Sequence, residues 1–403
     1  MANTLLTIDK ITPKSLACLH DELVFAKSVN RQYDDQFAQS GLKIGSNLRI
    51  RKPQQPVVNT GKTAVVQDDI EQFLNLTFDV SQDQLNTTFQ FGSAEMALDL
   101  DLFAERVLAP ASKILASRVE QKEINNCIKG VDNLVVANTT LSSLDVLRAN
   151  SFMTEQTCPT SERFLMVNPT DEVDYINANA NLFNAADSIG EQYKDAFVGR
   201  ANGNTWMRSN RINTITNGGT VAGTLSATTL EGGSTLVLAG LSNAQVIPAG
   251  TVITVAAVNG VQVETKNNTG RLRQMSVLST VTATAGGAAT VVVNPLFASS
   301  TDGRQNVDAL PQNGAAFAIA GVADTTYRQS LAYNKDAFTV ASADLELPQG
   351  GAKGARSVME GISMRINKGW NILGDDDITR MDVFTTSAVL RPEYASKIWV
   401  PVT

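Results

Sequence analysis

Residues 217–240 read "NGGTVAGTLSATTLEGGSTLVLAG" and contain one charged residue, Glu231. From 213 to 322 the chain has 8 charged residues in 110, whereas residues 1–212 have 46 in 212 and residues 323–403 have 19 in 81. Turn motifs such as "EGG", "PAG" and "TAGG" separate runs of β-branched residues at intervals of about ten residues, which is typical of a small β sandwich or barrel. We therefore expect residues 213–322 to form a β domain, able to fold alone, that is inserted into a host domain whose composition resumes after it.

The overall composition is that of a globular protein. Hydrophobic residues make up 43% and charged residues 18% of the 403 residues, and the net charge of -7 argues against tight nucleic-acid binding. The cysteines, Cys18, Cys127 and Cys158, are far apart and form no CxxC pair, so we expect reduced thiols rather than a zinc site or a disulfide framework. The sequence contains no signal-peptide pattern and no apolar run long enough for a transmembrane helix.

Residues 1–40 are expected to form an N-terminal helical arm. An apolar stripe recurs at steps of three and four residues, which is helical spacing. The sequence suggests no partner for this stripe within the chain, and the burial of a leucine side chain is worth about 1.5–3 kcal/mol, so we expect another surface to cover it. The stripe residues taken as contact candidates are Leu16, Leu19, Leu23 and Val29.

Residues 41–92 are expected to form an extended, two-stranded loop. The stretch "GLKIGSNLRIRKPQQPVV" alternates apolar and polar residues with strand period, and Pro53 and Pro56 limit how far it can pair in a sheet. Its basic residues, Arg49, Arg51 and Lys52, form either a solvated strand face or a surface that meets an acidic partner.

The host domain is expected to comprise residues 93–212 and 323–403. A helix is expected from Ser93, and a second one over 110–129, with Pro110 at its first turn and Gly130 after its end. The other expected elements are a buried strand in "RFLMVNP" (163–169), a helix capped by Thr170, a helix over 187–197, a strand in "NTWMRSNRI", and closing strands in "YRQSLAYNKDAFTVAS" and "VMEGISMRINKGWNI".

No group of residues points to catalysis or to a cofactor. The single histidine, His20, excludes sites that need two, and Asp375 to Asp377 match no calcium loop and are expected to form a solvated turn. The glycine-rich "GGAKGAR" (350–356) lacks the spacing of a phosphate-binding loop and is expected to be a flexible loop. The sequence therefore predicts a non-enzyme without metal or cofactor.

The order of these parts resembles a known family. The motifs "GLKIGSNLRIRKP", "ERVLAP", "LMVNP" and "GISMRI", together with the arm, the extended loop and the insertion, resemble the major capsid (coat) protein of short-tailed bacteriophages. The resemblance covers essentially the whole chain. It implies an α+β fold of the HK-ninety-seven-like (Johnson) type, with an N-terminal arm, an extended β-hairpin loop, a spine helix, peripheral and axial domains, and an inserted all-β domain.

The resemblance also implies a function, partners and a location. The chain would self-assemble as hexamers and pentamers into an icosahedral shell around a double-stranded DNA genome, and the insertion would lie on the outer surface. A scaffolding protein and a portal would be partners, the DNA would be bound only weakly and non-specifically, and no membrane would be involved. The shell would assemble in the bacterial host cytoplasm and remain as the virion capsid. In some family members a lysine of the extended loop is cross-linked, and the candidates here are Lys43, Lys52 and Lys62.

An alternative class is a β-rich phage or bacterial surface adhesion protein, whose Thr/Gly-rich β domain would bind a receptor. A signal sequence or a repeated β unit would favour this alternative, and the sequence contains neither.

Overall fold

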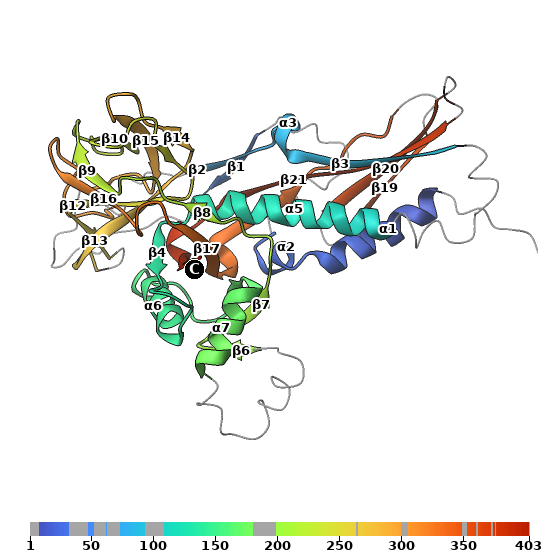
Figure 1. Cartoon of the computed structure of the whole chain (residues 1–403). Helices are drawn as coiled ribbons and strands as arrows, with labels where there is room; N and C mark the ends of the chain where they lie inside the picture. Colours follow the sequence, from blue (N-terminus) through green and yellow to red (C-terminus); the bar gives the residue numbers. More distant parts are fainter. Residues whose placement is uncertain are drawn as a thin grey trace, which may run out of the picture. The chain divides into compact units, whose positions relative to one another are not determined.

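The computed structural model describes a chain that folds as two compact units, whose elements are labelled in Figure 1. Unit 1 lies within Met1–Ile50, Phe73–Ile124 and Thr339–Ala388, and unit 2 within Arg51–Gln72, Asn125–Phe338 and Val389–Thr403. The described residues are 8–31, 47–51, 62, 73–92, 109–179, 199–262, 265–299, 305–348, 353–359, 362–371, 374 and 376–402. None of the described helices is long and apolar enough to cross a membrane.

Unit 1 is a five-stranded sheet covered by helices. The strands run in the order β18-β21-β20-β19, and β3 also pairs with β21. Figure 1 shows α1 and α5 along this sheet, and their apolar side chains pack with those of β20 and β21 in one core cluster. The elements are α1 (Ile8–Glu22), α2 (Phe25–Ser28), α3 (Val80–Asp83), β3 (Gln84–Gly92), α5 (Ala109–Lys129, whose last turn belongs to unit 2), β18 (Phe338–Ser342), β19 (Lys353–Met359), β20 (Ile362–Asn371) and β21 (Asp376–Val389).

The expected extended loop is shorter than residues 41–92. Strands β1 (Asn47–Arg51) and β2 (Phe73–Thr77) pair as a separate two-stranded sheet. Residues 84–92 were expected in the loop but form β3, which pairs with β21 over nine residues. The physical reason is that Leu85 and Phe89 pack against the core cluster of unit 1. Burial of these apolar side chains makes pairing with the sheet more favourable than exposure of the strand to solvent.

The host part of unit 2 is a seven-stranded mixed sheet in the order β4-β22-β17-β5-β7-β6, with β8 paired to β17. Helix α6 begins with a capping box between Ser142 and Asp145. Helix α7 begins at Pro169. Thr170 was expected to cap this helix, but the cap is the side chain of Asn168, which accepts a hydrogen bond from the backbone N–H of Thr170. The elements are β4 (Asn133–Val136), α6 (Ser143–Glu155), β5 (Arg163–Val167), α7 (Pro169–Asn179), β6 (Arg200–Ala201), β7 (Asn204–Arg208), β8 (Ile215–Thr216), β17 (Thr326–Asn334) and β22 (Ala395–Pro401).

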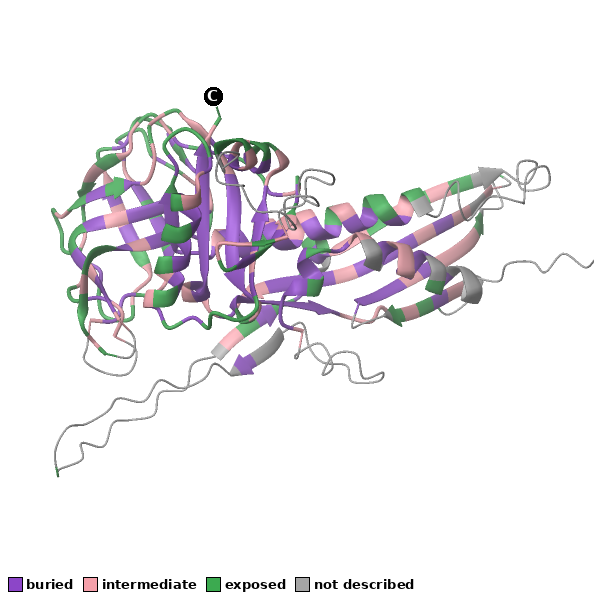
Figure 2. Cartoon of the chain, turned by 90° about the horizontal axis from the view of Figure 1, so that it is seen from below, coloured by how far each residue is buried: buried purple, intermediate pink, exposed green. Residues whose placement is uncertain are grey.

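The low-charge segment contains a closed β barrel with the strand order β10-β15-β13-β12-β16-β9. Its interior is a separate core cluster that includes Leu236, Ile253 and Met275, and Figure 2 shows buried residues along its strands. A self-contained core agrees with independent folding of residues 213–322, which stays a prediction. The strands are β9 (Ala222–Leu225), β10 (Thr235–Ala239), β12 (Val252–Val261), β13 (Asn268–Val277), β15 (Ala289–Asn294) and β16 (Ala316–Ile319), and β11 (Val246–Ile247) pairs separately with β14 (Val281–Thr282).

Two segments expected to be loops are partly strand. Asp376 and Asp377 begin β21, where they pair with Gly92 and Phe91 of β3 on one side and with the end of β20 on the other. Gln90 donates a hydrogen bond to Asp376. Residues 353–356 of the glycine-rich segment lie in β19, which is paired with β20. The acidic and glycine-rich composition of these segments predicted loops, but their backbones form strand pairs with the neighbouring strands. Asp375, residues 350–352 and the helices expected over 93–108 and 187–197 lie outside the described residues.

Candidate functional site

Helix α5 carries three charged residues on the side that faces the rest of unit 1. Glu120 and Glu123 are fully buried, and the side chain of Lys122 is about one-fifth exposed. Burial of a carboxylate is costly unless hydrogen bonds or an opposite charge compensate it. The contacts of these three side chains join α5 to the N-terminal helices, to α3 and to β21.

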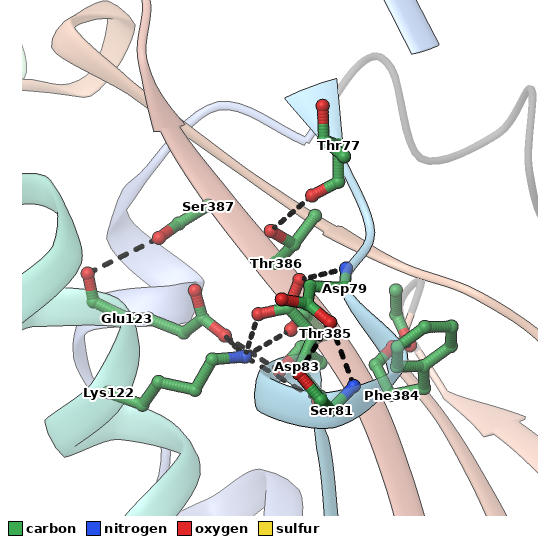
Figure 3. A network of polar contacts seen from close by, with 11 residues as sticks. Thr77, Asp79, Ser81, Asp83, Lys122, Glu123, Phe384, Thr385, Thr386 and Ser387 are labelled. Carbon is green, nitrogen blue, oxygen red and sulfur yellow. Dashed lines mark hydrogen bonds and ion pairs between the residues drawn. The ribbon is translucent and has the colours of Figure 1, made fainter. Parts of the chain in front are cut away.

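Lys122 sits at the centre of a network of oxygen atoms (Figure 3). Its Nζ lies 2.8 Å from Asp83 Oδ1 and 3.3 Å from Glu123 Oε1, and it donates to the carbonyl of Thr385 at 2.5 Å. One ammonium on α5 therefore contacts two carboxylates and offsets one of their two negative charges, and it connects α5 with α3 and β21.

Glu123 is held from the β21 side as well. Thr385 Oγ1 donates to Glu123 Oε1 at 2.8 Å, and Ser387 Oγ contacts the Glu123 carbonyl at 3.4 Å. The adjacent Thr386 Oγ1 donates to the carbonyl of Thr77, the last residue of β2, at 3.2 Å (Figure 3). Strand β21 thus connects the spine helix α5 with the two-stranded sheet β1–β2.

The turn between β2 and β3 is stabilised by its own carboxylates. Asp79 caps α3 by accepting from Ser81 N at 2.8 Å and from Ser81 Oγ at 2.7 Å, and these hydrogen bonds lower the pKa of Asp79. Asp83 Oδ2 accepts from Asp79 N at 2.8 Å while its Oδ1 binds Lys122. The base of the extended loop is therefore fixed in one geometry relative to α5.

Glu120 ties the N-terminal arm to the same helix. Its Oε1 accepts from the backbone N–H groups of Val24, at 2.6 Å, and of Phe25, at 2.5 Å. Helix α2 has no side-chain cap of its own, so Glu120 satisfies N–H groups that a helix start leaves free. The arm, the extended loop and the sheet are thus joined at neighbouring positions of α5.

Replacing Glu120 with alanine is expected to loosen the arm locally. A buried N–H group that loses its acceptor costs about 1–3 kcal/mol, so amide hydrogen exchange in residues 24–28 should accelerate measurably. Glu120→Gln keeps an acceptor oxygen and should stay closer to wild type. Gln121→Ala, at a partly exposed position on the same helix, is the control, and equal exchange in all three variants would contradict the role given to Glu120.

The apolar stripe of the arm has an intrachain partner, so the expectation that another surface covers it is wrong. Leu16, Leu19 and Leu23 are at most 1% exposed and pack in the core cluster of unit 1, and Val29 is 2% exposed. In that cluster α5 contributes Leu115 and Val119, while β20 and β21 contribute the facing side chains. Helical spacing identifies a buried face but not the surface that buries it, and here long-range folding brings that surface from residues 111–119 and 362–383.

The other contact candidates remain predictions. Arg49 and Arg51 lie in β1, and their side chains, like all of Lys52 and Lys43, are outside the described residues. Lys62 is exposed.

The three cysteines, all among the described residues, form no disulfide: Cys127 and Cys158 are buried and Cys18 is partly exposed. Burial raises the pKa of Cys158 to about 11, so this thiol stays protonated at neutral pH.

The sequence interpretation missed Glu120, Lys122 and Glu123. A signal was present, because Ala116, Val119, Glu120, Glu123 and Cys127 follow helical spacing and all five are buried. Two acids within an apolar stripe indicate buried carboxylates that need partners. The identity of those partners depends on residues 24–25, 83 and 385, which lie far away in the sequence.

Comparison with known proteins places the chain among phage coat proteins. Residues 1–397 match a family model described as P22 coat protein, gene protein 5. A search of curated proteins finds no match.

Solved structures resemble the chain at low sequence identity. A chain from Mycobacterium phage Che8 is 11% identical, with 93% of this chain and 90% of that chain covered and a TM-score of 0.49. The capsid of Ralstonia phage GP4 is 8% identical, with 93% and 87% covered and a TM-score of 0.48. The capsid of cyanophage P-SCSP1u is 11% identical, with 90% and 86% covered and a TM-score of 0.43.

Proposed function

The chain belongs to the P22 coat protein family, and from this membership we propose how its parts serve a phage shell. The family match across residues 1–397 is the observation that carries the function. The chain is a major capsid protein with an α+β Johnson-type fold, and its copies form an icosahedral shell. Family membership favours this function over the adhesion protein that the Thr/Gly-rich segment also allowed.

In the proposed assembly, hexamers and pentamers form when the extended loop of one subunit lies over its neighbour. A two-stranded sheet is marginally stable alone, so β1 and β2 gain from a partner surface. The basic residues Arg49, Arg51 and Lys52 favour an acidic patch on that neighbour. The Lys122 network fixes the base of the loop and thereby limits the directions in which the loop can extend.

The remaining parts of the proposal concern partners and location. The inserted barrel lies on the outer surface of the shell, and the net charge of -7 keeps contacts with packaged double-stranded DNA weak and non-specific. A scaffolding protein and a portal take part in assembly in the bacterial host cytoplasm, after which the chain resides in the virion capsid. The role is structural, without catalysis or a cofactor.

Electron microscopy and sedimentation of the protein co-expressed with a scaffolding protein test this function. We expect closed shells from wild type and at least a tenfold loss of shells from Arg49→Glu/Arg51→Glu/Lys52→Glu, since like charges across an interface cost several kcal/mol, about tenfold for each 1.4 kcal/mol. Lys62→Glu changes an exposed lysine between β1 and β2 and controls for a single charge reversal in the same segment, whereas the triple variant reverses three charges. Wild-type protein that stays monomeric under all salt and concentration conditions would refute the shell function, and a triple variant that assembles normally would refute the role of the basic residues.

A further inference from the structure

The barrel and the seven-stranded sheet of unit 2 meet around a completely buried lysine. Lys397 lies on β22 of the host sheet, between the buried residues Ser396 and Ile398, and has no exposed surface. A lysine is almost never fully buried without a partner for its charge, because the ammonium loses its hydration. The contacts of Lys397 therefore need an explanation beyond core packing.

The ammonium of Lys397 points to the barrel. Its Nζ donates to the carbonyl of Gly250 at 2.6 Å and to Ser276 Oγ at 3.1 Å. Ser276 is also fully buried and donates its own hydroxyl proton to the carbonyl of Lys129, at the end of α5, at 2.7 Å. Lys397 thus bridges the two parts of unit 2 through two barrel residues.

Other contacts of the same barrel strand surround this bridge. Arg273 Nη2 lies 2.5 Å from Asp132 Oδ2, and both side chains are at least nine-tenths buried. Gln274 exchanges two hydrogen bonds with the backbone of Leu134, at 2.8 and 3.0 Å. Three residues of strand β13, namely Arg273, Gln274 and Ser276, therefore contact the part of unit 2 outside the barrel.

In the described part of the chain, the contact region between β13 and β22 (the joint) contains one carboxylate, on Asp132, and two basic groups, on Arg273 and Lys397. Arg273 already pairs with Asp132, so among the described residues Lys397 has no carboxylate of its own. Burial lowers the pKa of Lys397 to about 7, and the nearby charge of Asp132 opposes this effect only in part. Burial also raises the pKa of Asp132. Other charged groups on the elements that pack against β22 have partners elsewhere, namely Arg328 with Asp171, Asp145 with Ser142 and Arg148, and Glu155 with Arg271.

We propose that Lys397 is a proton-dependent latch that sets how tightly the inserted barrel docks on its host sheet. A neutral lysine amine keeps two N–H donors, enough for both Gly250 and Ser276, so loss of the proton removes the buried charge without removing either hydrogen bond. The docked joint is therefore favoured when Lys397 is neutral and weakened when it is charged. The inference concerns a single chain and does not depend on shell assembly.

The direction of the pH dependence follows from proton counts. In the undocked state Lys397 meets water and has the ordinary lysine pKa near 10.5, whereas in the docked state its pKa is about 7. Between these values the undocked state binds more protons at Lys397, so the contribution of Lys397 to the docking equilibrium rises with pH, by up to about tenfold per pH unit. Below pH 7 both states are protonated, and this contribution becomes constant.

Hydrogen exchange of the full-length protein between pH 6 and pH 9, corrected for the intrinsic pH dependence of exchange, tests the latch. Protection of the amides in residues 130–136 and 273–277 should rise with pH in wild type. Lys397→Met keeps the apolar stem but cannot titrate, so its protection should be flat across this range. Lys335→Met changes a half-exposed lysine directly after β17 and should follow wild type.

Asp132→Asn provides a second variant in case Lys397→Met does not fold. The carboxylate of Asp132 stabilises the charged form of Lys397, so its removal should move the rise in protection to lower pH. A merely structural contact would lower protection in this variant without moving the pH at which the rise begins. Flat protection in wild type, the same slope in Lys397→Met as in wild type, or an unmoved onset in Asp132→Asn would overturn the proposal.

Discussion

Serine at both Leu19 and Leu23 is expected to destabilise the subunit itself, by about 2–5 kcal/mol for each position. Both side chains have no exposed surface and pack against α5, β20 and β21 in the core of unit 1. Each substitution leaves a cavity and buries a hydroxyl in apolar surroundings, so the loss should reach the upper part of that range. Urea or thermal unfolding of the monomer measures the effect.

Ile114→Ser is the matched control for the leucine variants. Ile114 lies on α5 and is 65% exposed. A surface substitution of this kind changes stability by about 0.5 kcal/mol or less. If the Leu19/Leu23 variant kept the melting temperature of wild type and lost only its yield of shells, the arm would not be packed within its own subunit.

Lys122→Met is expected to cost about 3 kcal/mol of stability and to lower shell yield. Its removal leaves Glu123, which is fully buried, and Asp83, which is largely buried, without their cation, and breaking a buried ion pair on one side costs about 3–5 kcal/mol. The lower end applies because Lys122 keeps some contact with water. Chemical unfolding gives the stability, and sedimentation gives the shell yield.

Two further variants separate the charge effect from helix propensity. Lys113→Met removes a lysine from the same helix, where Lys113 and Glu22 form an exposed pair at 3.4 Å, and it should cost at most about 1 kcal/mol. Lys122→Met/Glu123→Gln removes both charges and should recover part of the lost stability, as a double-mutant cycle measures. Equal losses from Lys113→Met and Lys122→Met would show that the network at the loop base contributes nothing specific.

Several elements follow from local sequence alone. The strand at 163–167, the helix that ends at Lys129 before Gly130, and the β-rich character of the low-charge segment were all predictable. Strand alternation, helix spacing and turn residues act over a few positions, and these patterns are complete within each segment. The motif order likewise led to the coat-protein family, which the match over residues 1–397 confirms.

The sheet partners depended on contacts that no local pattern contains. Apolar and polar residues alternate over 84–92, a pattern that also fits a strand of the extended loop. These residues instead pair with β21 (Asp376–Val389), which lies almost three hundred residues later in the chain. The barrel order β10-β15-β13-β12-β16-β9 also departs from chain order. Many strand arrangements bury the same alternating faces, and only the packing of the whole sheet selects one of them.

The sequence by itself determined which faces are buried, where the β-rich insertion lies and to which family the chain belongs. Only the tertiary structure decided what covers each buried face and what compensates each buried charge. Leu19 and Leu23 face the core of their own unit, Glu120 caps the start of α2, and Lys397 reaches the barrel. The physical reason is that hydrophobic spacing is a local property of the chain, whereas the partner of a buried carboxylate or ammonium must come within about 3 Å through long-range folding.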